Sequence, residues 1–465
     1  MDLSFSQFIL IVATIAVVIG GGIYAARSVK SAEGYSLGGR AAGVPLVAGS
    51  IAGTCVGGGA TVGTAQLAST IGLSAWWFTI GTGLSLILMG LFYARPLRRT
   101  SLETVSQYLI LNYGKASGNF TSIASSAGIL FSAVASCLPG IQILMVILGI
   151  PDWAAAGILL VLVASYSFFG GMKSAGVGGI LKMVIVWVSL FLAGSSAIYA
   201  IQTQPEIMAA LPDYPWFSLF GSGLSNVLTS LFSLIVGMLC TQTYIQAIFS
   251  ASNPRTASIG AFTAALITIP VGLPCAMIGM YMHATHPEVS PILVLPTYLL
   301  EYQPTLIGGI AMGGIVLSLI SSIAGLSLGI GTMLSRDILT KALHVTRPEN
   351  QLRLTRVVVL GVIILSSGIA ILNEGSQVLF WNYLSMALRG GGIFLPLTLA
   401  IFRPHAIAGH WAIASMVLST LVAIAAAILH SPVSPLFIGL GLSFILLIPG
   451  YIQNRGHHFM EHSLH

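Results

Sequence analysis

Three serines at helical spacing are the first residues whose type and position could do chemistry. Ser318, Ser321 and Ser322 occupy positions i, i+3 and i+4, so a helix places them on one face. Neighbouring hydroxyls, joined by a few carbonyl oxygens, would form a hard-oxygen site for an alkali cation. Serines in membrane helices also often bond back to the preceding turn of their own helix. The triplet therefore needs a second element that supplies carbonyl oxygens.

The glycine-rich residues 47–68, VAGSIAGTCVGGGATVGTAQLA, could supply them. Glycine in a helix interior costs about 1 kcal/mol relative to alanine, and this segment contains Gly49, Gly53, Gly57, Gly58, Gly59 and Gly63. Small residues allow two membrane helices to pack closely. Alternatively, a locally unwound helix offers its carbonyls to a cation and its half-helix ends to a substrate. The sequence leaves both interpretations open.

Arg389 is the residue most informative about a substrate, because it lies deep inside the apolar stretch 376–402. An ionisable side chain at that depth is costly, is usually functional and should face the interior of the bundle. There it could bind an anion, and a small carboxylate-bearing organic anion is then the expected substrate. A gating or packing role for the guanidinium is the alternative.

The composition requires lipid as the solvent of the elements that carry these residues. Only 6% of the residues are charged, 56% are hydrophobic and the mean hydropathy is +0.95, whereas a water-facing surface needs far more charge. About 20 apolar residues cross a bilayer as a helix. We therefore predict an all-α membrane protein with about thirteen transmembrane helices, at residues 5–26, 45–68, 74–94, 119–149, 153–170, 178–201, 223–250, 257–283, 306–335, 353–373, 376–402, 406–429 and 433–452. The first is expected to be a retained span, since no signal-peptide cleavage pattern follows it.

The basic residues predict the orientation of these spans. Lys and Arg collect on the cytoplasmic side, and seventeen of the eighteen fall on one side of the predicted alternation, Arg389 being the exception. We predict a multi-pass protein of the plasma (inner) membrane with its N-terminus outside and its C-terminus in the cytoplasm. This topology explains the net charge of +6 without a nucleic-acid partner.

Other classes of function leave no pattern in the sequence. It contains no GxxxxGK[ST] motif for ATP-driven transport, and the predicted spans hold no His–Glu or Asp–Asp constellation for a membrane enzyme. We expect neither enzymatic activity nor an organic cofactor. The four cysteines are expected to be small buried hydrophobes, and the histidine-rich tail NRGHHFMEHSLH a solvated end. A channel, or a transporter-like sensor without coupled flux, is an alternative to transport.

Six segments of the chain form an ordered set of motifs. The first two are residues 34–40, GYSLGGR, and the glycine-rich segment after them. The other four are RPLRRTSLETVSQYL (95–109), SYSFFGGMKSAGVGGILKMVI (165–185), TQTYIQAIFSASNPRTA (241–257) and SSIAGLSLGIGTMLSRDI (321–338). In this order they resemble motifs of the sodium:solute symporter family, in which the first two correspond to the entry into the second span and its broken helix. The resemblance covers about residues 30–405.

The resemblance implies a leucine-transporter-like fold and sodium-coupled uptake of a small solute by alternating access. Residues 1–30 would add one span, residues 31–405 would form the core, with spans 2–6 and 7–11 as two inverted five-helix repeats, and residues 406–465 would add two spans and a tail. The family's sodium site would fall on the carbonyls of Gly53, Val56 and Ser318 and the hydroxyls of Ser321 and Ser322. The candidates for substrate binding are Cys55, Ala60, Gln242, Tyr383 and Arg389.

Two residues depart from the family pattern near the start of span 6. Gly179 stands where many members carry Asp, and Lys182 where many carry Gln. In other transporters of this architecture a lysine on the fifth core helix stands in for sodium, which would make transport proton-linked or ion-independent. The alternative is an ordinary lysine that extends to the cytoplasmic interface.

Overall fold

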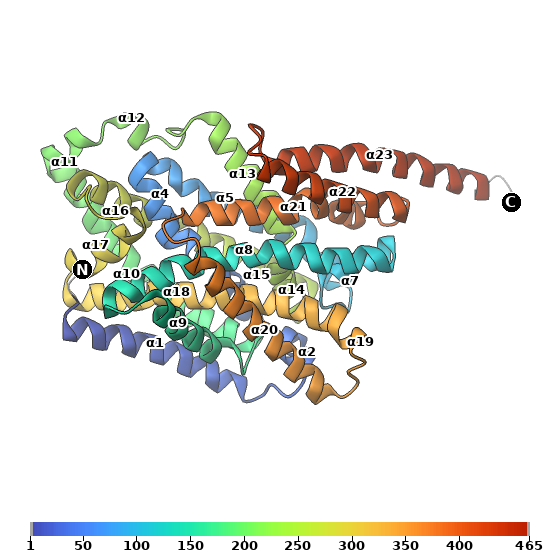
Figure 1. Cartoon of the computed structure of the whole chain (residues 1–465), viewed down its shortest axis with the longest axis horizontal. Helices are drawn as coiled ribbons and strands as arrows, with labels where there is room; N and C mark the ends of the chain where they lie inside the picture. The colour runs from blue at the N-terminus through green and yellow to red at the C-terminus, as the bar shows by residue number, and fades with distance from the viewer. Residues whose placement is uncertain (1–2, 463–465) are drawn as a thin grey trace.

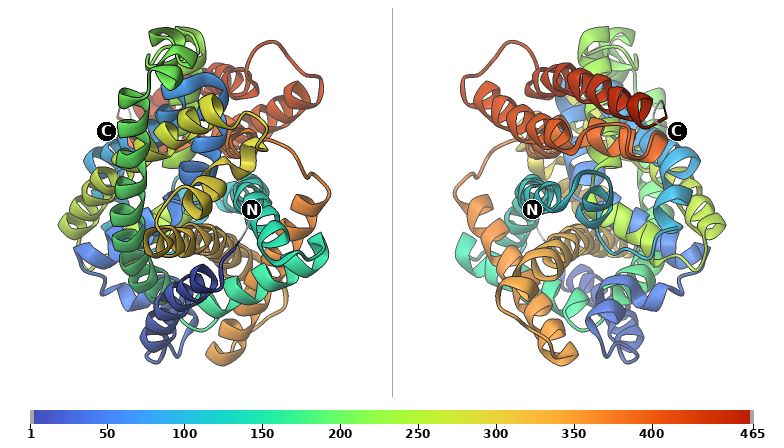
Figure 2. Two further views of the ribbon diagram at one scale, coloured as in Figure 1. Left: turned by 90° about the vertical axis from the view of Figure 1, so that its left-hand side faces the viewer. Right: turned by 90° about the vertical axis from the view of Figure 1, so that its right-hand side faces the viewer.

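The computed structural model describes residues 3–462, with side chains as far as Asn454. The chain forms an elongated bundle of helices, most of which run along its long axis (Figure 1). Views along that axis show α22 and α23 on one side of the bundle and α1 on the opposite side (Figure 2). Helices in lipid satisfy their backbone hydrogen bonds internally, and this accounts for the architecture.

The first half of the chain contains α1 (Phe5–Ala26), α2 (Ala32–Leu37), α3 (Val44–Cys55), α4 (Thr64–Ile71), α5 (Trp77–Leu88), α6 (Ala94–Arg98), α7 (Val105–Tyr113), α8 (Lys115–Leu148), α9 (Asp152–Ser167), α10 (Met172–Thr203), α11 (Pro205–Ala210) and α12 (Asp213–Trp216). Local signals set several helix starts. Ser4 and Gln7 form a capping box for α1, and the Thr104 hydroxyl accepts from the amide of Gln107 at the start of α7.

The second half contains α13 (Leu224–Leu239), α14 (Gln242–Ser250), α15 (Pro254–Thr268), α16 (Gly272–Thr285), α17 (Val294–Glu301), α18 (Thr305–Thr332), α19 (Thr340–Ala342), α20 (Pro348–Ile371), α21 (Val378–Phe402), α22 (Gly409–Ile428) and α23 (Pro435–His462). Several predicted spans agree with these helices within a few residues, for example 5–26 with α1 and 376–402 with α21.

The predicted all-helical membrane fold is confirmed, but the number of full-length spans is lower than thirteen. The described residues contain ten helices long and apolar enough to cross a membrane, or eleven if the bent pair α13 and α14 is one span. The difference arises because two predicted spans, 45–68 and 153–170, contain the shorter apolar helices α3 and α9. The continuous helical stretch Gly59–Arg98 also takes in both the last part of predicted span 45–68 and the whole of predicted span 74–94.

Two helices are broken at the centre of the protein. Helix α3 ends at Cys55, and a π-helical turn begins only at Gly59, while α13 and α14 meet at an angle of 48°. They are the first helices of the two predicted repeats, and transporters built from inverted repeats carry such breaks at their binding sites. The division into residues 1–30, 31–405 and 406–465 stays a prediction.

The two ends of the bundle differ in charge. Helices α2, α7 and α19 lie at one end, and α11, α12 and α17 lie at the other (Figure 1). The first end, here called the basic end, includes Arg40, Arg98, Lys173 and Arg336. Its assignment to the cytoplasm stays a prediction. The side chain of Arg455 and the histidine-rich tail lie outside the described side chains.

Candidate functional site

The break after α3 frees backbone carbonyls inside the bundle. Val56 has non-helical dihedral angles (φ −82°, ψ 67°), so the regular hydrogen-bond ladder stops there. The carbonyls of Gly53 and Val56, which a continuous helix would engage with amides four residues later, accept side-chain hydrogen bonds instead. The glycine-rich segment therefore provides the carbonyl oxygens that its sequence suggests.

Helix α10 packs against this break with almost no space between the two backbones. A Cβ atom on Gly53 would lie 2.8 Å from Gly179 Cα, and one on Gly179 would lie 2.0 Å from the carbonyl oxygen of Gly49. Only glycine fits at such an approach. Close packing and helix breaking are thus both present in the same segment, and they are not alternatives.

Lys182 enters the break from α10. Its side chain is fully buried, and its Nζ donates to the carbonyl oxygens of Gly53 (2.7 Å) and Val56 (2.8 Å) and lies 2.9 Å from Ser321 Oγ. Ser321 in turn donates to the Gly53 carbonyl at 2.8 Å. Three contacts match the three N–H groups of an ammonium. The interfacial position considered for Lys182 is wrong, because its amine points into the protein.

The other predicted sodium ligands lie around the Lys182 ammonium. Ser318 is buried on α18, and its carbonyl accepts from Ser321 Oγ at 3.3 Å, while its own hydroxyl donates back to Gly314. Ser322 is buried beside the break, where a Cβ atom on Gly57 would lie 2.3 Å from its hydroxyl. The structure thus brings the predicted ligands together and places the Lys182 ammonium among them.

A small cavity adjoins the break after α3 and is the candidate substrate chamber. Its volume is about 20 Å³, roughly the room that one water molecule needs, and the residues that line it include Cys55, Phe78, Tyr244, Ser322, Asn382 and Arg389. None of its described lining residues is Asp or Glu. A larger groove between α3, α10 and α15 is lined almost wholly by apolar side chains, so it offers no comparable group for recognising a polar solute.

Arg389 connects three helices at the chamber wall. The side chain is 1% exposed, its Nε donates to the Gly237 carbonyl of α13 (3.2 Å), and its Nη1 donates to Ser132 of α8 (3.3 Å) and to Ser385 of α21. All of these partners are neutral. Among the described residues, no carboxylate forms an ion pair with Arg389.

The remaining substrate candidates differ in their position relative to the chamber. Tyr383 packs edge-on against Phe78, a chamber wall residue, with the ring centroids 6.1 Å apart. Ala60 is buried in the π-helical turn after the break. Gln242 lies outside the described chamber lining, because its amide bonds to the backbone of Val105 (2.8 Å) and Glu103 (3.0 Å) toward the basic end.

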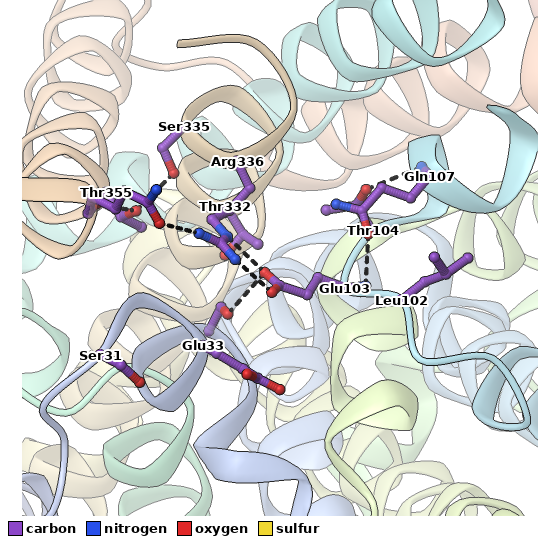
Figure 3. A network of polar contacts seen from close by, with 12 residues as sticks. Ser31, Glu33, Leu102, Glu103, Thr104, Gln107, Thr332, Ser335, Arg336 and Thr355 are labelled. Atoms are coloured by element: carbon purple, nitrogen blue, oxygen red, sulfur yellow. Dashed lines mark hydrogen bonds and ion pairs between the residues drawn. The ribbon is translucent and has the colours of Figure 1, made fainter. Parts of the chain in front are cut away.

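A polar network at the basic end is a feature that the sequence did not reveal. Arg336 forms a two-pronged ion pair with Glu103 (2.9 and 2.8 Å) and donates to Gln351 (2.7 Å) (Figure 3). The adjacent Asp337 is buried, and Thr104, Gln107 and Ser122 donate to its carboxylate at 2.9–3.0 Å. Most of these residues belong to two segments of the family resemblance, 95–109 and 321–338. That resemblance was the only indication in the sequence that the two segments matter. The network joins these segments across the basic end.

The broken helices, the buried cation and the enclosed chamber define a secondary transporter of the leucine-transporter-like fold. The sequence matches the family described as Sodium:solute symporter family over residues 35–418. The chain therefore belongs to the sodium:solute symporter family, which is a family of membrane transporters and not of enzymes. The family couples transport to sodium, and a small solute is implied as its cargo.

Curated relatives and solved structures agree with this assignment. The chain is 26% identical over 343 residues to the high affinity choline transporter 1 of Homo sapiens and 25% identical over 326 residues to that of Torpedo marmorata, covering 68% and 66% of this chain. The matches span 59% and 56% of those relatives, so the chain aligns with less than two thirds of their length.

Two solved structures share the fold. A Na+-coupled sialic acid symporter, in a substrate-bound outward-open state, superposes with a TM-score of 0.81 at 18% identity and 98% coverage of both chains. The nucleobase-cation-symport-1 transporter Mhp1, in a closed conformation with bromovinylhydantoin bound, superposes with a TM-score of 0.58 at 15% identity, covering 90% of this chain and 94% of that one.

Proposed function

We propose that this chain is a secondary transporter of a small solute in which the Lys182 ammonium takes the place of the coupling sodium ion. One observation carries the proposal: Nζ lies within 2.9 Å of Gly53 O, Val56 O and Ser321 Oγ. These oxygens belong to the set that the family resemblance assigns to sodium. The proposal makes transport independent of sodium.

Electrostatics oppose the simultaneous presence of sodium. Two unit charges 4 Å apart repel by about 4 kcal/mol at an effective dielectric constant of 20, which corresponds to a loss of about a thousandfold in sodium affinity. The ammonium also uses the carbonyl oxygens that would coordinate the ion. Sodium could bind there only after Lys182 lost its proton or withdrew.

Lys182 is also the group through which transport could be linked to protons. The titratable side chains nearest the chamber side of Lys182 are Cys55, next to the break, and Tyr244 on α14. Neither is a carboxylate, so a proton taken up or released in the transport cycle would be carried by the Lys182 amine. Such a link would appear as pH-dependent transport that disappears in Lys182→Ala.

Sodium coupling is the second candidate, and the family membership favours it. In that case Gly53, Val56, Ser318, Ser321 and Ser322 would hold the ion after Lys182 moved aside. Further proposals are a plasma-membrane location with the N-terminus outside and the basic end in the cytoplasm. A sensor without flux is separated from both candidates by any measured solute uptake.

Direct binding of ²²Na+ to the purified protein tests the proposal without a known solute. We expect no saturable binding by the wild type at millimolar sodium near neutral pH. Lys182→Ala removes the competing charge and should acquire sodium binding. Lys173→Ala is the matched control, because Lys173 lies on the same helix but contacts Ser28 at the basic end. Saturable millimolar binding by the wild type would refute the assignment.

A further inference from the structure

We infer that the solute is a small organic anion whose carboxylate binds the guanidinium of Arg389. This inference rests on the proposed transport function and specifies its substrate class. It begins from the charge of the chamber, whose described lining contains Arg389 but neither Asp nor Glu. A buried charge that is met only by neutral groups is costly, and an anion relieves that cost.

The guanidinium is oriented by neutral partners. Gly237, Ser132 and Ser385 hold Nε and Nη1 through a carbonyl and two hydroxyls. None of the hydrogen bonds described for the chain uses Nη2 of Arg389. A planar guanidinium held at Nε and Nη1 can present the N–H groups of Nη2 to a carboxylate oxygen, and such charge-assisted bonds are the stronger kind.

A second cation lies across the break. Lys182 is held by Gly53, Val56 and Ser321, of which Val56 directly follows Cys55 in the chamber wall. The chamber region thus carries two positive groups and no described acidic side chain. This field attracts an anion and repels a quaternary ammonium such as choline, the solute for which the related choline transporters are named.

The rest of the wall indicates a small solute with a mixed body. Phe78, Met238, Leu326 and Met386 supply apolar surface, while Asn382 and the hydroxyl of Ser136 supply hydrogen-bonding groups. The cavity volume of about 20 Å³ is well below the usual range for small-molecule sites, so the surrounding helices must separate to admit a solute, and a small solute requires the least separation. A short monocarboxylate, with or without a hydroxyl or keto group, matches this chemistry.

A panel of paired ligands tests the inference on the wild-type protein. Acetate, propionate, lactate and pyruvate are compared with their amides and with choline, by thermal unfolding of the purified protein and by uptake of the labelled ligands into proteoliposomes. At least one acid should stabilise the protein and be transported, with half-saturation at least tenfold lower than that of its amide. Each pair keeps the shape of the solute and removes its charge.

Variants of Arg389 locate the contact. Arg389→Lys keeps the charge but loses the planar guanidinium, and should raise the acid concentration at half-saturation by tenfold or more. Arg389→Gln should abolish the preference for acid over amide, and Lys173→Ala serves as the control of unchanged affinity. Since Arg389→Gln could fail to fold, the ligand panel on the wild type and the Arg389→Lys variant carry the test.

The outcomes separate this inference from the proposed coupling. Equal binding of acids and amides, binding of choline, or no binding by any acid of the panel would overturn the inference. The same assays are run with sodium and with potassium. A sodium requirement with a clear preference for acids would overturn only the role of Lys182, whereas sodium-independent transport of amides or choline would overturn only the substrate class.

Discussion

The contact between Gly179 and the α3 backbone leads to a prediction that the structure makes quantitative. In Gly179→Ala the new Cβ would lie 2.0 Å from the Gly49 carbonyl oxygen, whereas C···O contacts are normally about 3.3 Å or longer. The obstacle is backbone, which cannot rotate away as a flexible side chain can. Helices α3 and α10 must therefore separate by about 1 Å to accept one methyl group.

That separation would act on Lys182, which lies three residues further along α10. Its bonds to Gly53 and Val56 are 2.7 and 2.8 Å long, so a shift of this size would stretch them beyond about 3.5 Å, where a hydrogen bond is lost. Each bond to a charged group contributes about 1.5–3 kcal/mol, and overpacking costs about 1–3 kcal/mol. Because the flexible lysine stem can follow part of the shift, we expect a total loss of about 2–4 kcal/mol.

Thermal unfolding of the detergent-solubilised protein, followed by tryptophan fluorescence, measures this loss. Gly157→Ala is the matched control, since its Cβ would meet nothing within 4 Å on α9 and alanine is the better helix former. We expect Gly179→Ala to melt at a clearly lower temperature than the wild type and Gly157→Ala to melt at the same temperature or slightly higher. Equal melting of Gly179→Ala and the wild type would contradict the close contact and the position of Lys182 that depends on it.

Two further predictions concern the cation site and the basic end. Ser321→Ala removes a partner of Lys182 and should lower the free energy of unfolding by about 1–2 kcal/mol. The Ser322 hydroxyl bonds to neither Lys182 nor Gly53, so Ser322→Ala should lower it by less. Equal effects of the two variants in thermal unfolding would argue against the described contacts. Glu103→Gln removes one charge of the ion pair with Arg336, so the basic end should open more often. Thiol reagents applied from that side should then label Cys55 faster, and Cys55→Ala gives the background labelling of the other cysteines. An unchanged labelling rate would show that the network does not control access.

Hydropathy predicted the membrane class and many helix positions because long apolar stretches have no other stable solution. It missed the bend between α13 and α14, since Cys240 and Thr241 at that point are not helix breakers and the nearby glycine, Gly237, lies inside the last turn of α13. The span count was too high for a related reason. Broken helices such as α3 are apolar like full spans, but they do not continue far enough to cross the membrane alone.

The site could be predicted only where one segment contained the information. The serine face of α18 and the glycine-rich break were readable because their periodicity and composition are local. For Lys182 the sequence left two positions open, the sodium site and the cytoplasmic interface, because the reach of its side chain depends on how closely Gly179 allows α10 to approach α3. The ion pair of Glu103 with Arg336 joins residues that are 233 positions apart, and no local pattern predicts such a contact.

A cation that is covalently part of the transporter changes the charge balance of each cycle. Lys182 returns with its helix, so an organic anion would cross the membrane without a companion ion. Movement of one negative charge into a cell against 100 mV, negative inside, costs about 2.3 kcal/mol. At equilibrium the anion concentration inside would therefore be about fiftyfold lower than outside. A transporter with these properties moves its anion outward along the potential, exchanges one anion for another, or imports the anion together with a proton that cancels its charge.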